Sequence, residues 1–175
     1  NLHPFDIYAS PISGGSYVIY FSKIKRDKTI ALKKAEIEEA DLGVDEFKSW
    51  VRFASKVENH RIDLKNILVS LKENGKSIIA YGASARSSTL LNYCNISTES
   101  IDLIVDQSHY KHGLFSPGTK IPIKSPSEGL NHNPDVILLL AWNFKDEIIH
   151  QLKYNWNWSG DLILPLPGSP KIIKI

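Results

Sequence analysis

The sequence predicts an α/β protein, a three-layer sandwich built around a mostly parallel sheet and preceded by a strand and a long helix. Short, mainly apolar runs at 77–81, 102–106 and 135–140 are typical of strands that are covered on both faces. A helical segment follows the first and the third of these runs, and this alternation favours a parallel sheet with crossover helices. We therefore expect a Rossmann-like arrangement.

The chain before residue 44 contains fewer structural signals. We expect residues 1–10 to be irregular, because His3-Pro4 disfavours a helix. Residues 17–21 are dense in β-forming side chains, which predicts one strand. The basic run at 23–34 also contains an aspartate and apolar residues, and we expect it to be a solvated hairpin or loop.

Residues 44–74 predict one long helix, or two helices end to end, that stops at Asn74-Gly75. Their apolar spacing of threes and fours predicts a single buried stripe. The stripe consists of Phe47, Trp50, Val51, Ala54, Val57, Leu64, Leu68 and Leu71. Because such a helix is longer than the small domain that follows it, we expect one end to pack on another domain of a parent protein. The absence of methionine and the start at Asn1 also suggest a piece of something longer.

The turn after the first buried strand is the leading candidate for a binding site. Gly82 permits a close turn, and Ser84 can cap the helix that follows. Small residues, among them Ala83 and Ser87, leave backbone N–H groups open, while Arg86 adds a positive charge. A helix N-terminus of this kind favours phosphate, which indicates a nucleotide or nucleotide-sugar site. The alternative is an ordinary strand-to-helix turn without a ligand.

A dinucleotide site is a second alternative. Asp106 ends the second strand, where dinucleotide folds place the acid that holds a ribose. Aligned on Gly82, however, the second and third glycines of that fingerprint are replaced by Ser84 and Ser87. The missing glycines weaken the dinucleotide signal, but because of Asp106 an oxidoreductase domain that binds NAD(P) stays open as an alternative.

The loop at 107–120 lies where a parallel sheet usually binds ligands, at its carboxyl edge. It carries Tyr110, Lys111 and His112. We expect no metal there, because His109 and His112 have neither a cysteine pair nor a helix to hold them. The net charge of +2 and the scattered lysines do not indicate nucleic acid as a partner. No apolar run approaches the roughly 20 residues of a membrane span, and the single cysteine, Cys94, suits the cytoplasm.

Several motifs occur together in a recognisable order. They are Gly82-Ala-Ser-Ala-Arg-Ser-Ser-Thr-Leu-Leu-Asn92, Val105-Asp106, Tyr110-Lys-His-Gly113, Pro117-Gly-Thr-Lys-Ile-Pro-Ile123, Pro134-Asp135 and Ala141-Trp-Asn-Phe-Lys-Asp-Glu-Ile148. With these motifs the chain resembles, over nearly its whole length, the C-terminal domain of SAM-dependent sugar C-methyltransferases. These enzymes methylate a carbon of a keto-deoxysugar that is carried on a nucleoside diphosphate.

The resemblance implies a division of the chain into two parts and assigns the cofactor to a separate domain. Residues 1–43 would be a linker or crossover segment with one strand from a preceding SAM domain, and 44–175 would be the Rossmann-like substrate-binding domain. S-adenosylmethionine would be held by that SAM domain, which lies outside this chain. We therefore expect no cofactor in this fragment and no turnover by it alone.

The resemblance also implies roles for particular residues. Ser13-Gly-Gly-Ser16 resembles a His-Gly-Gly-Ser motif whose histidine is a candidate base, so Ser13 takes the base position, with Tyr8 or His3 as a stand-in. A serine hydroxyl is a poor base without an activating partner, which keeps a non-catalytic nucleotide-binding module open. The residues implied to bind the sugar nucleotide are Gly14, Gly15, Ser16, Gly82, Ala83, Ser84, Arg86, Ser87, Thr89, Asp106, Tyr110, Lys111, His112, Trp142 and Asn143.

Overall fold

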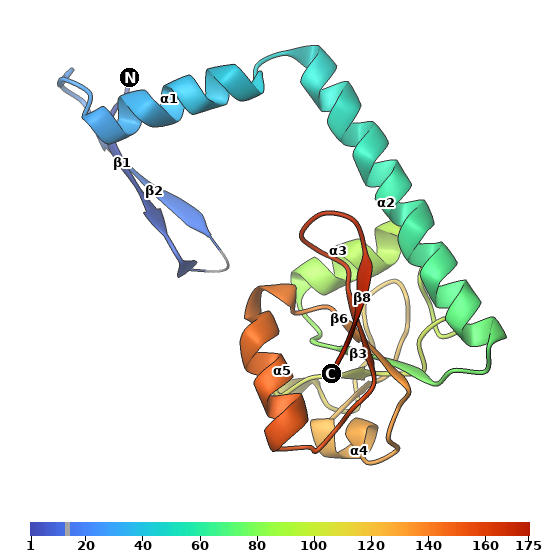
Figure 1. Ribbon diagram of the computed structural model, residues 1–175. Coiled ribbons are helices and arrows are strands. Elements are labelled where there is room, and N and C mark those ends of the chain that lie inside the picture. Colours follow the sequence, from blue (N-terminus) through green and yellow to red (C-terminus); the bar gives the residue numbers. More distant parts are fainter. Residues whose placement is uncertain (13–14) are drawn as a thin grey trace. The chain divides into compact units, whose positions relative to one another are not determined.

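The computed structural model describes residues 1–12 and 15–175, which form two compact units, Asn1–Val57 and Glu58–Ile175 (Figure 1). The first unit contains a two-stranded sheet and a helix, and it also holds the start of a second helix. The second unit contains a six-stranded sheet with helices on both faces. Ser13 and Gly14 lie outside the described residues.

The sheet of the first unit pairs β1 (His3–Ser10) with β2 (Ser16–Ser22) in antiparallel register. The strand expected at 17–21 is therefore confirmed, whereas the irregular conformation expected for 1–10 is wrong. Proline is tolerated here because the register is interrupted between Pro4 and Asp6, so the missing N–H falls at a bulge near the start of the strand.

Helix α1 (Ile30–Leu42) follows the hairpin and begins inside the basic run. Thr29 caps it, since its side chain accepts the backbone N–H of Leu32 at 3.3 Å, and Gly43 ends it with a φ of 63°. The loop expected over 23–34 is thus wrong from Ile30 onward. Thr29 is a typical N-cap residue and marks the start of this helix. The helix has a weak apolar pattern, since Leu32 is its only buried residue.

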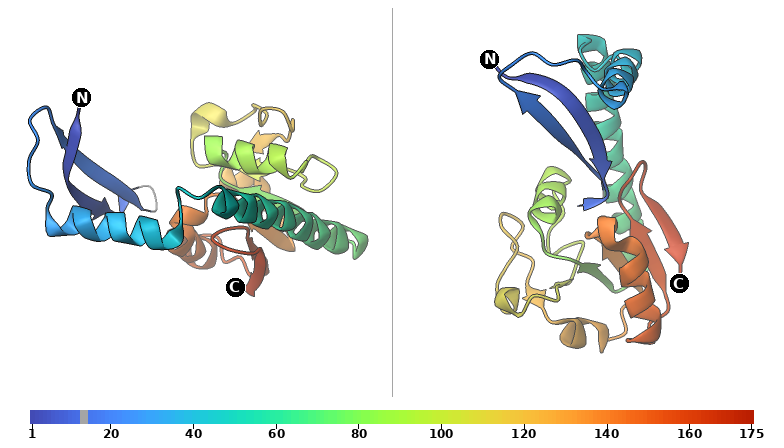
Figure 2. Two further views of the ribbon diagram at one scale, coloured as in Figure 1. Left: turned by 90° about the horizontal axis from the view of Figure 1, so that it is seen from above. Right: turned by 90° about the vertical axis from the view of Figure 1, so that its left-hand side faces the viewer.

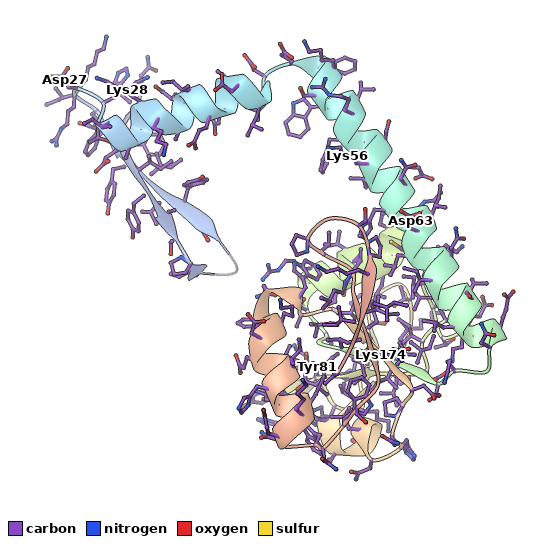
Figure 3. The ribbon with its side chains drawn as sticks, in the orientation of Figure 1. Asp27, Lys28, Lys56, Asp63, Tyr81 and Lys174 are labelled. Atoms are coloured by element: carbon purple, nitrogen blue, oxygen red, sulfur yellow. The ribbon has the colours of Figure 1, made fainter. Side chains whose placement is uncertain are left out.

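Helix α2 (Phe47–Glu73) runs from the first unit into the second. It ends before Gly75, which has a φ of 72°, as predicted from Asn74-Gly75. The buried stripe is confirmed only for its later part: Leu64 and Leu68 are fully buried, but Phe47 is 82% exposed. Side chains of α1 and of the start of α2 extend away from their helices (Figure 3).

No helix among the described residues has the length and apolar character required to cross a membrane.

The sheet of the second unit has the order β5-β4-β3-β6-β7-β8. The first five strands in that order are parallel, and β8 is antiparallel to β7. The strands are β3 (Ile78–Tyr81), β4 (Ile104–Val105), β5 (Ile123–Lys124), β6 (Val136–Leu139), β7 (Asp161–Leu164) and β8 (Lys171–Lys174). The α/β prediction is confirmed. The chain starts in the middle at β3, moves outward through β4 and β5, and then returns to β6 on the other side of β3. This reversal is the position where open α/β sheets bind ligands.

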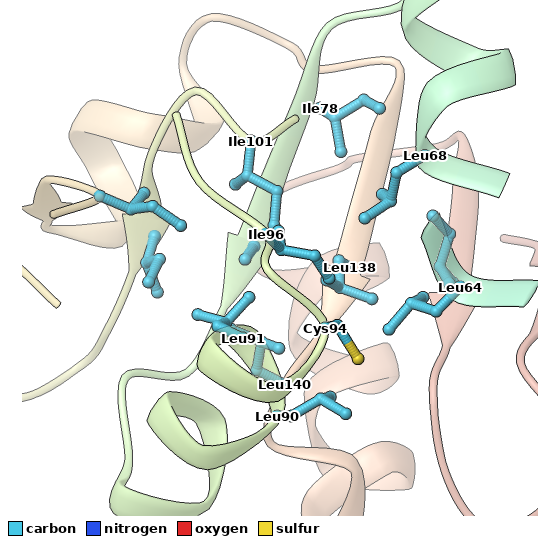
Figure 4. Packing of buried hydrophobic residues seen from close by; sticks show 14 of the residues in the cluster. Leu64, Leu68, Ile78, Leu90, Leu91, Cys94, Ile96, Ile101, Leu138 and Leu140 are labelled. Carbon is cyan, nitrogen blue, oxygen red and sulfur yellow. The ribbon is translucent and has the colours of Figure 1, made fainter. Parts of the chain in front are cut away.

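The alternation of side chains along each strand produces two cores, one on each face of the sheet. Ile78 and Ala80 of β3 face α2 and α3 (Ala85–Tyr93), in the cluster of Figure 4. Ile79 and Tyr81 face the other way, toward α4 (Pro126–Leu130) and α5 (Lys145–Tyr154). Figure 2 shows the sheet of this unit between the two sets of helices. All four residues of β3 are buried, so the strand is packed on both faces. The turn that follows β3 is therefore held at the carboxyl edge of the sheet.

Candidate functional site

Gly82 lies at the reversal point of the sheet and holds two neighbouring strands close together. Its N–H donates to the carbonyl oxygen of Val105 at 2.8 Å, and its φ of 101° is in the region that favours glycine. A Cβ atom at this position would lie 2.7 Å from the Cβ of Ala141, the second residue after β6. The turns that follow β3 and β6 therefore touch, and a larger residue at 82 would separate them.

The turn after Gly82 is closed by a pair of serines. The Oγ of Ser84 accepts the N–H of Ser87 at 3.2 Å, and the Oγ of Ser87 accepts the N–H of Ser84 at 3.0 Å. Ser87 also donates its hydroxyl proton to the carbonyl oxygen of Gly82 at 2.8 Å, so Ser84 is the donor in the 2.8 Å contact between the two hydroxyls. The predicted cap at Ser84 is confirmed. Ser87, only 1% exposed, supports the turn from inside.

Asp106 links the loop after β4 to the turn after β3. Its Oδ2 accepts the N–H of Ala83 at 2.7 Å and the ammonium of Lys111 at 3.0 Å, and its Oδ1 accepts the N–H of Ser108 at 2.9 Å. Lys111 donates in addition to the carbonyl oxygen of Ala83 at 2.7 Å. Both carboxylate oxygens of Asp106 are therefore already used in positioning the two loops.

The remaining predicted residues of the loop differ in their surroundings. His112 holds its Nε2 atom 2.7 Å from the backbone oxygen of Asp106, so this nitrogen carries the proton and donates. Tyr110, in the short helix η2 (His109–Lys111), is 81% exposed, and its ring centroid lies 3.9 Å from that of His109. Within 1–12 and 15–175, no three His, Cys, Asp or Glu residues are placed to hold a metal ion.

Arg86 and Trp142 come together from the two sides of the reversal point. Arg86 is in the first turn of α3, and Trp142 begins the short helix η3 (Trp142–Phe144) after β6. The guanidinium carbon of Arg86 lies 5.9 Å from the ring centroid of Trp142, a cation–π distance. Thr89, one turn further along α3, donates its hydroxyl to the carbonyl oxygen of Ala85 at 3.1 Å. The structure thus brings a cation and an aromatic ring together where a ligand is expected.

A groove of about 510 Å³ opens beside Trp142. It is lined by Trp142, Asn143, Phe144, Lys145, Asp146, Glu147, Leu164, Leu166, Pro167 and Lys171. The Trp142-Asn143 turn was expected to line the binding cleft. The residues from 164 onward were missed, because β8 is antiparallel to β7 and only this long-range pairing brings Lys171 to the groove.

The other predicted site residues belong to the first unit. Tyr8, on β1, is 51% exposed and its ring centroid lies 6.2 Å from that of Tyr20. Ser16 begins β2 and donates its hydroxyl to the carbonyl oxygen of Ile12 at 2.7 Å. Gly15 has a φ of 119°. Ser13 and Gly14, which were also predicted, lie outside the described residues.

The fold and these motifs define the class of protein, and the comparison with known families agrees. Residues 11–167 match the model of the C-methyltransferase C-terminal domain, and the chain belongs to this family. Among curated proteins, the chain is similar to C-methyltransferase NovU of Streptomyces niveus, with 32% identity over 175 residues. The match covers 99% of this chain but only 41% of NovU, so the chain spans about two fifths of the length of that relative.

Proposed function

We propose that this chain is the nucleotide-sugar-binding domain of a SAM-dependent C-methyltransferase that acts on a keto-deoxysugar carried by a nucleoside diphosphate. The observation that carries this proposal is the Arg86–Trp142 pair at the reversal point of the sheet, 5.9 Å apart. Family membership supplies the reaction class, and the pair supplies the chemistry for an anionic, aromatic ligand.

Arg86 is assigned the phosphate. Guanidinium groups bind phosphate oxygens in a bidentate manner, and the N-terminus of a helix such as α3 favours the same charge. The capping pair already engages the backbone N–H groups of Ser84 and Ser87. The side chain of Arg86, rather than a set of backbone amides, is therefore the main phosphate contact.

The described residues at the reversal point of the sheet are already occupied by contacts within the chain, which supports placing S-adenosylmethionine elsewhere. Gly82, which ends β3, is packed against Ala141, and both oxygens of Asp106 are engaged by Ala83, Ser108 and Lys111. We assign that cofactor to a SAM domain outside this chain and residues 1–43 to the crossover from it. The exposed side chain of Phe47, at 82%, suits coverage by such a domain.

Ser13 occupies the proposed base position, and its hydroxyl cannot remove a proton efficiently without an activating partner. Tyr8, on β1, is the candidate substitute. The parent enzyme is proposed to work in the cytoplasm, where the free Cys94 stays reduced. This fragment alone is not expected to turn over.

An NAD(P)-dependent oxidoreductase is the alternative, favoured only by the position of Asp106 at the end of β4. The engaged carboxylate oxygens of this residue argue against it, since a ribose would have to compete with Ala83 and Lys111. A non-catalytic nucleotide-binding module would use the same Arg86 and would differ only in lacking methyl transfer by the parent protein.

The test is calorimetric titration of the chain and of Arg86→Ala with UDP-, TDP- and GDP-hexoses. We expect at least one of them to bind, and Arg86→Ala to weaken that binding about tenfold, as expected for one charge-assisted contact. Arg52→Ala is the matched control, because Arg52 is an exposed arginine whose side chain bonds Ser49 in the first unit. Equal binding by Arg86→Ala and the wild type would contradict the phosphate assignment.

A further inference from the structure

The groove beside Trp142 lies outside the carboxyl ends of β6 and β7. Trp142 to Glu147 form one side, and Leu164, Leu166 and Pro167 continue from the end of β7. Its volume of about 510 Å³ falls within the range of about 300–1,000 Å³ that is typical of small-molecule sites.

The charges on the groove balance. Lys145 and Lys171 contribute two ammonium groups, while Asp146 and Glu147 contribute two carboxylates. The Nζ atom of Lys145 lies 3.3 Å from Oδ1 of Asp146, and Oε1 of Glu147 accepts a hydrogen bond from Nε2 of Gln151 at 3.0 Å. A neutral lining of this kind does not select a diphosphate, but it provides both donors and acceptors for a ligand rich in hydroxyl and carbonyl groups.

Asn143 adds a donor that has no acceptor. Its Nδ2 atom is buried and makes no hydrogen bond to any residue that the structure describes. An unsatisfied buried donor carries a free-energy cost, which a ligand carbonyl relieves when it accepts the bond. Asn143 also lines the groove, so this donor belongs to a residue beside the space where a ligand would bind.

The turn after β7, which carries Leu166 and Pro167, is in contact with α2. The Nδ1 atom of His60, on α2, lies 3.2 Å from the carbonyl oxygen of Gly168, which follows Pro167. This contact anchors the turn that carries Leu166 and Pro167. Leu164, Leu166 and Pro167 give the groove an apolar wall suited to the face of a flat ring.

From these features we infer that the groove binds the nucleoside part of a nucleoside diphosphate. The inference rests on the proposed function, in which Arg86, 5.9 Å from the ring of Trp142, takes the phosphate. The apolar wall packs against the base, Asn143 donates to a base carbonyl, and the carboxylates accept from ribose hydroxyls. The sugar to be methylated then points away from the groove.

The experiment uses the 175-residue chain, labelled with ¹⁵N, and titrates it with UDP, TDP, uridine, thymidine and inorganic diphosphate. We expect a nucleoside alone to shift the indole signal of Trp142 and the side-chain amide signals of Asn143, and diphosphate alone to shift the signals of Arg86. Trp158, which is 3% exposed in the core and bonds Pro134, provides an unchanged reference.

Asn143→Ala is expected to weaken UDP or TDP binding about tenfold without lowering the free energy of unfolding, since the removed donor has no partner in the described structure. Asn131→Ala, an exposed asparagine outside the groove, is the control. Unchanged affinity in Asn143→Ala, with binding still dependent on Arg86, would overturn the groove assignment and leave the proposed function intact. Failure of the wild type to bind any of these nucleotides would overturn both.

Discussion

The backbone N–H of Ala83 donates to Oδ2 of Asp106 at 2.7 Å, and this bond joins the turn after β3 to the end of β4. Asp106 is 9% exposed and also accepts from Lys111 and Ser108. The acid that stands where dinucleotide folds bind ribose therefore shapes the site in this chain, because its oxygens hold two loops together.

Asp106→Asn is expected to lower the free energy of unfolding by about 2 kcal/mol, because the amide has no negative charge to pair with Lys111 and its nitrogen cannot accept the N–H of Ser108. Urea denaturation measures the change. Asp146→Asn is the control, since the side chain of Asp146 is 93% exposed in its ion pair, and we expect a change below about 0.5 kcal/mol. Equal midpoints for Asp106→Asn and the wild type would contradict the positioning role.

Gly82→Ala tests the close approach of the two turns. The new Cβ would meet Ala141 at 2.7 Å and would also strain a backbone with a φ of 101°. Gly113→Ala shares the strain, with a φ of 81°, but its Cβ would have nothing within 4 Å. We expect Gly82→Ala to be less stable than Gly113→Ala by roughly 2 kcal/mol in thermal or urea unfolding. Similar losses in the two variants would mean that the turns do not touch.

Asp135 predicts a dependence of stability on acid pH. Hydrogen bonds from the backbone N–H and the hydroxyl of Ser77, and a contact with Lys76, lower the pKa of Asp135 from 3.8 to about 2. A lowered pKa stabilises the folded chain at pH values above the unfolded pKa, and this contribution is lost as the pH falls through the folded pKa. Urea unfolding should therefore show stability falling between about pH 4 and 2.

In Asp135→Asn this part of the acid dependence should be missing, and stability at pH 7 should be lower than in the wild type. Glu99→Gln removes an exposed carboxylate elsewhere and serves as the control. An Asp135→Asn variant with the same fall between pH 4 and 2 as the wild type would contradict the assignment.

Cys94 is fully buried, and burial raises the pKa of its thiol. Because the thiolate is the reactive form, we expect a thiol reagent to label the native chain no faster than the chain unfolds. Labelling in urea should be immediate. Rapid and complete labelling in native buffer would show that the core around α3 is open.

Strands with strong local signals were predicted from the sequence. The run at 77–81 became β3 and the run at 135–140 became β6, because continuous apolar residues have few alternatives to a buried strand. The cap at Ser84 was predictable because it depends only on residues within one helical turn. These local features placed the candidate site at the carboxyl end of β3.

Features that depend on distant contacts were not predicted. Helix α4 was also missed, although its signal is local: Ser125 and Glu128, three residues apart, form reciprocal hydrogen bonds that begin this short helix. The hydrogen bond from Ala83 to Asp106 joins residues 23 positions apart in the chain. Lys171 reaches the groove only through the antiparallel pairing of β8. No periodicity in the sequence reports such contacts.

Calorimetric titration of the chain with nucleotide sugars, NAD and S-adenosylmethionine in parallel tests the central claim most directly. The account predicts that a nucleoside diphosphate sugar binds, while NAD and S-adenosylmethionine do not. Binding of NAD instead would contradict it and indicate the oxidoreductase alternative, and binding of S-adenosylmethionine would place the cofactor site in this chain rather than in a separate SAM domain.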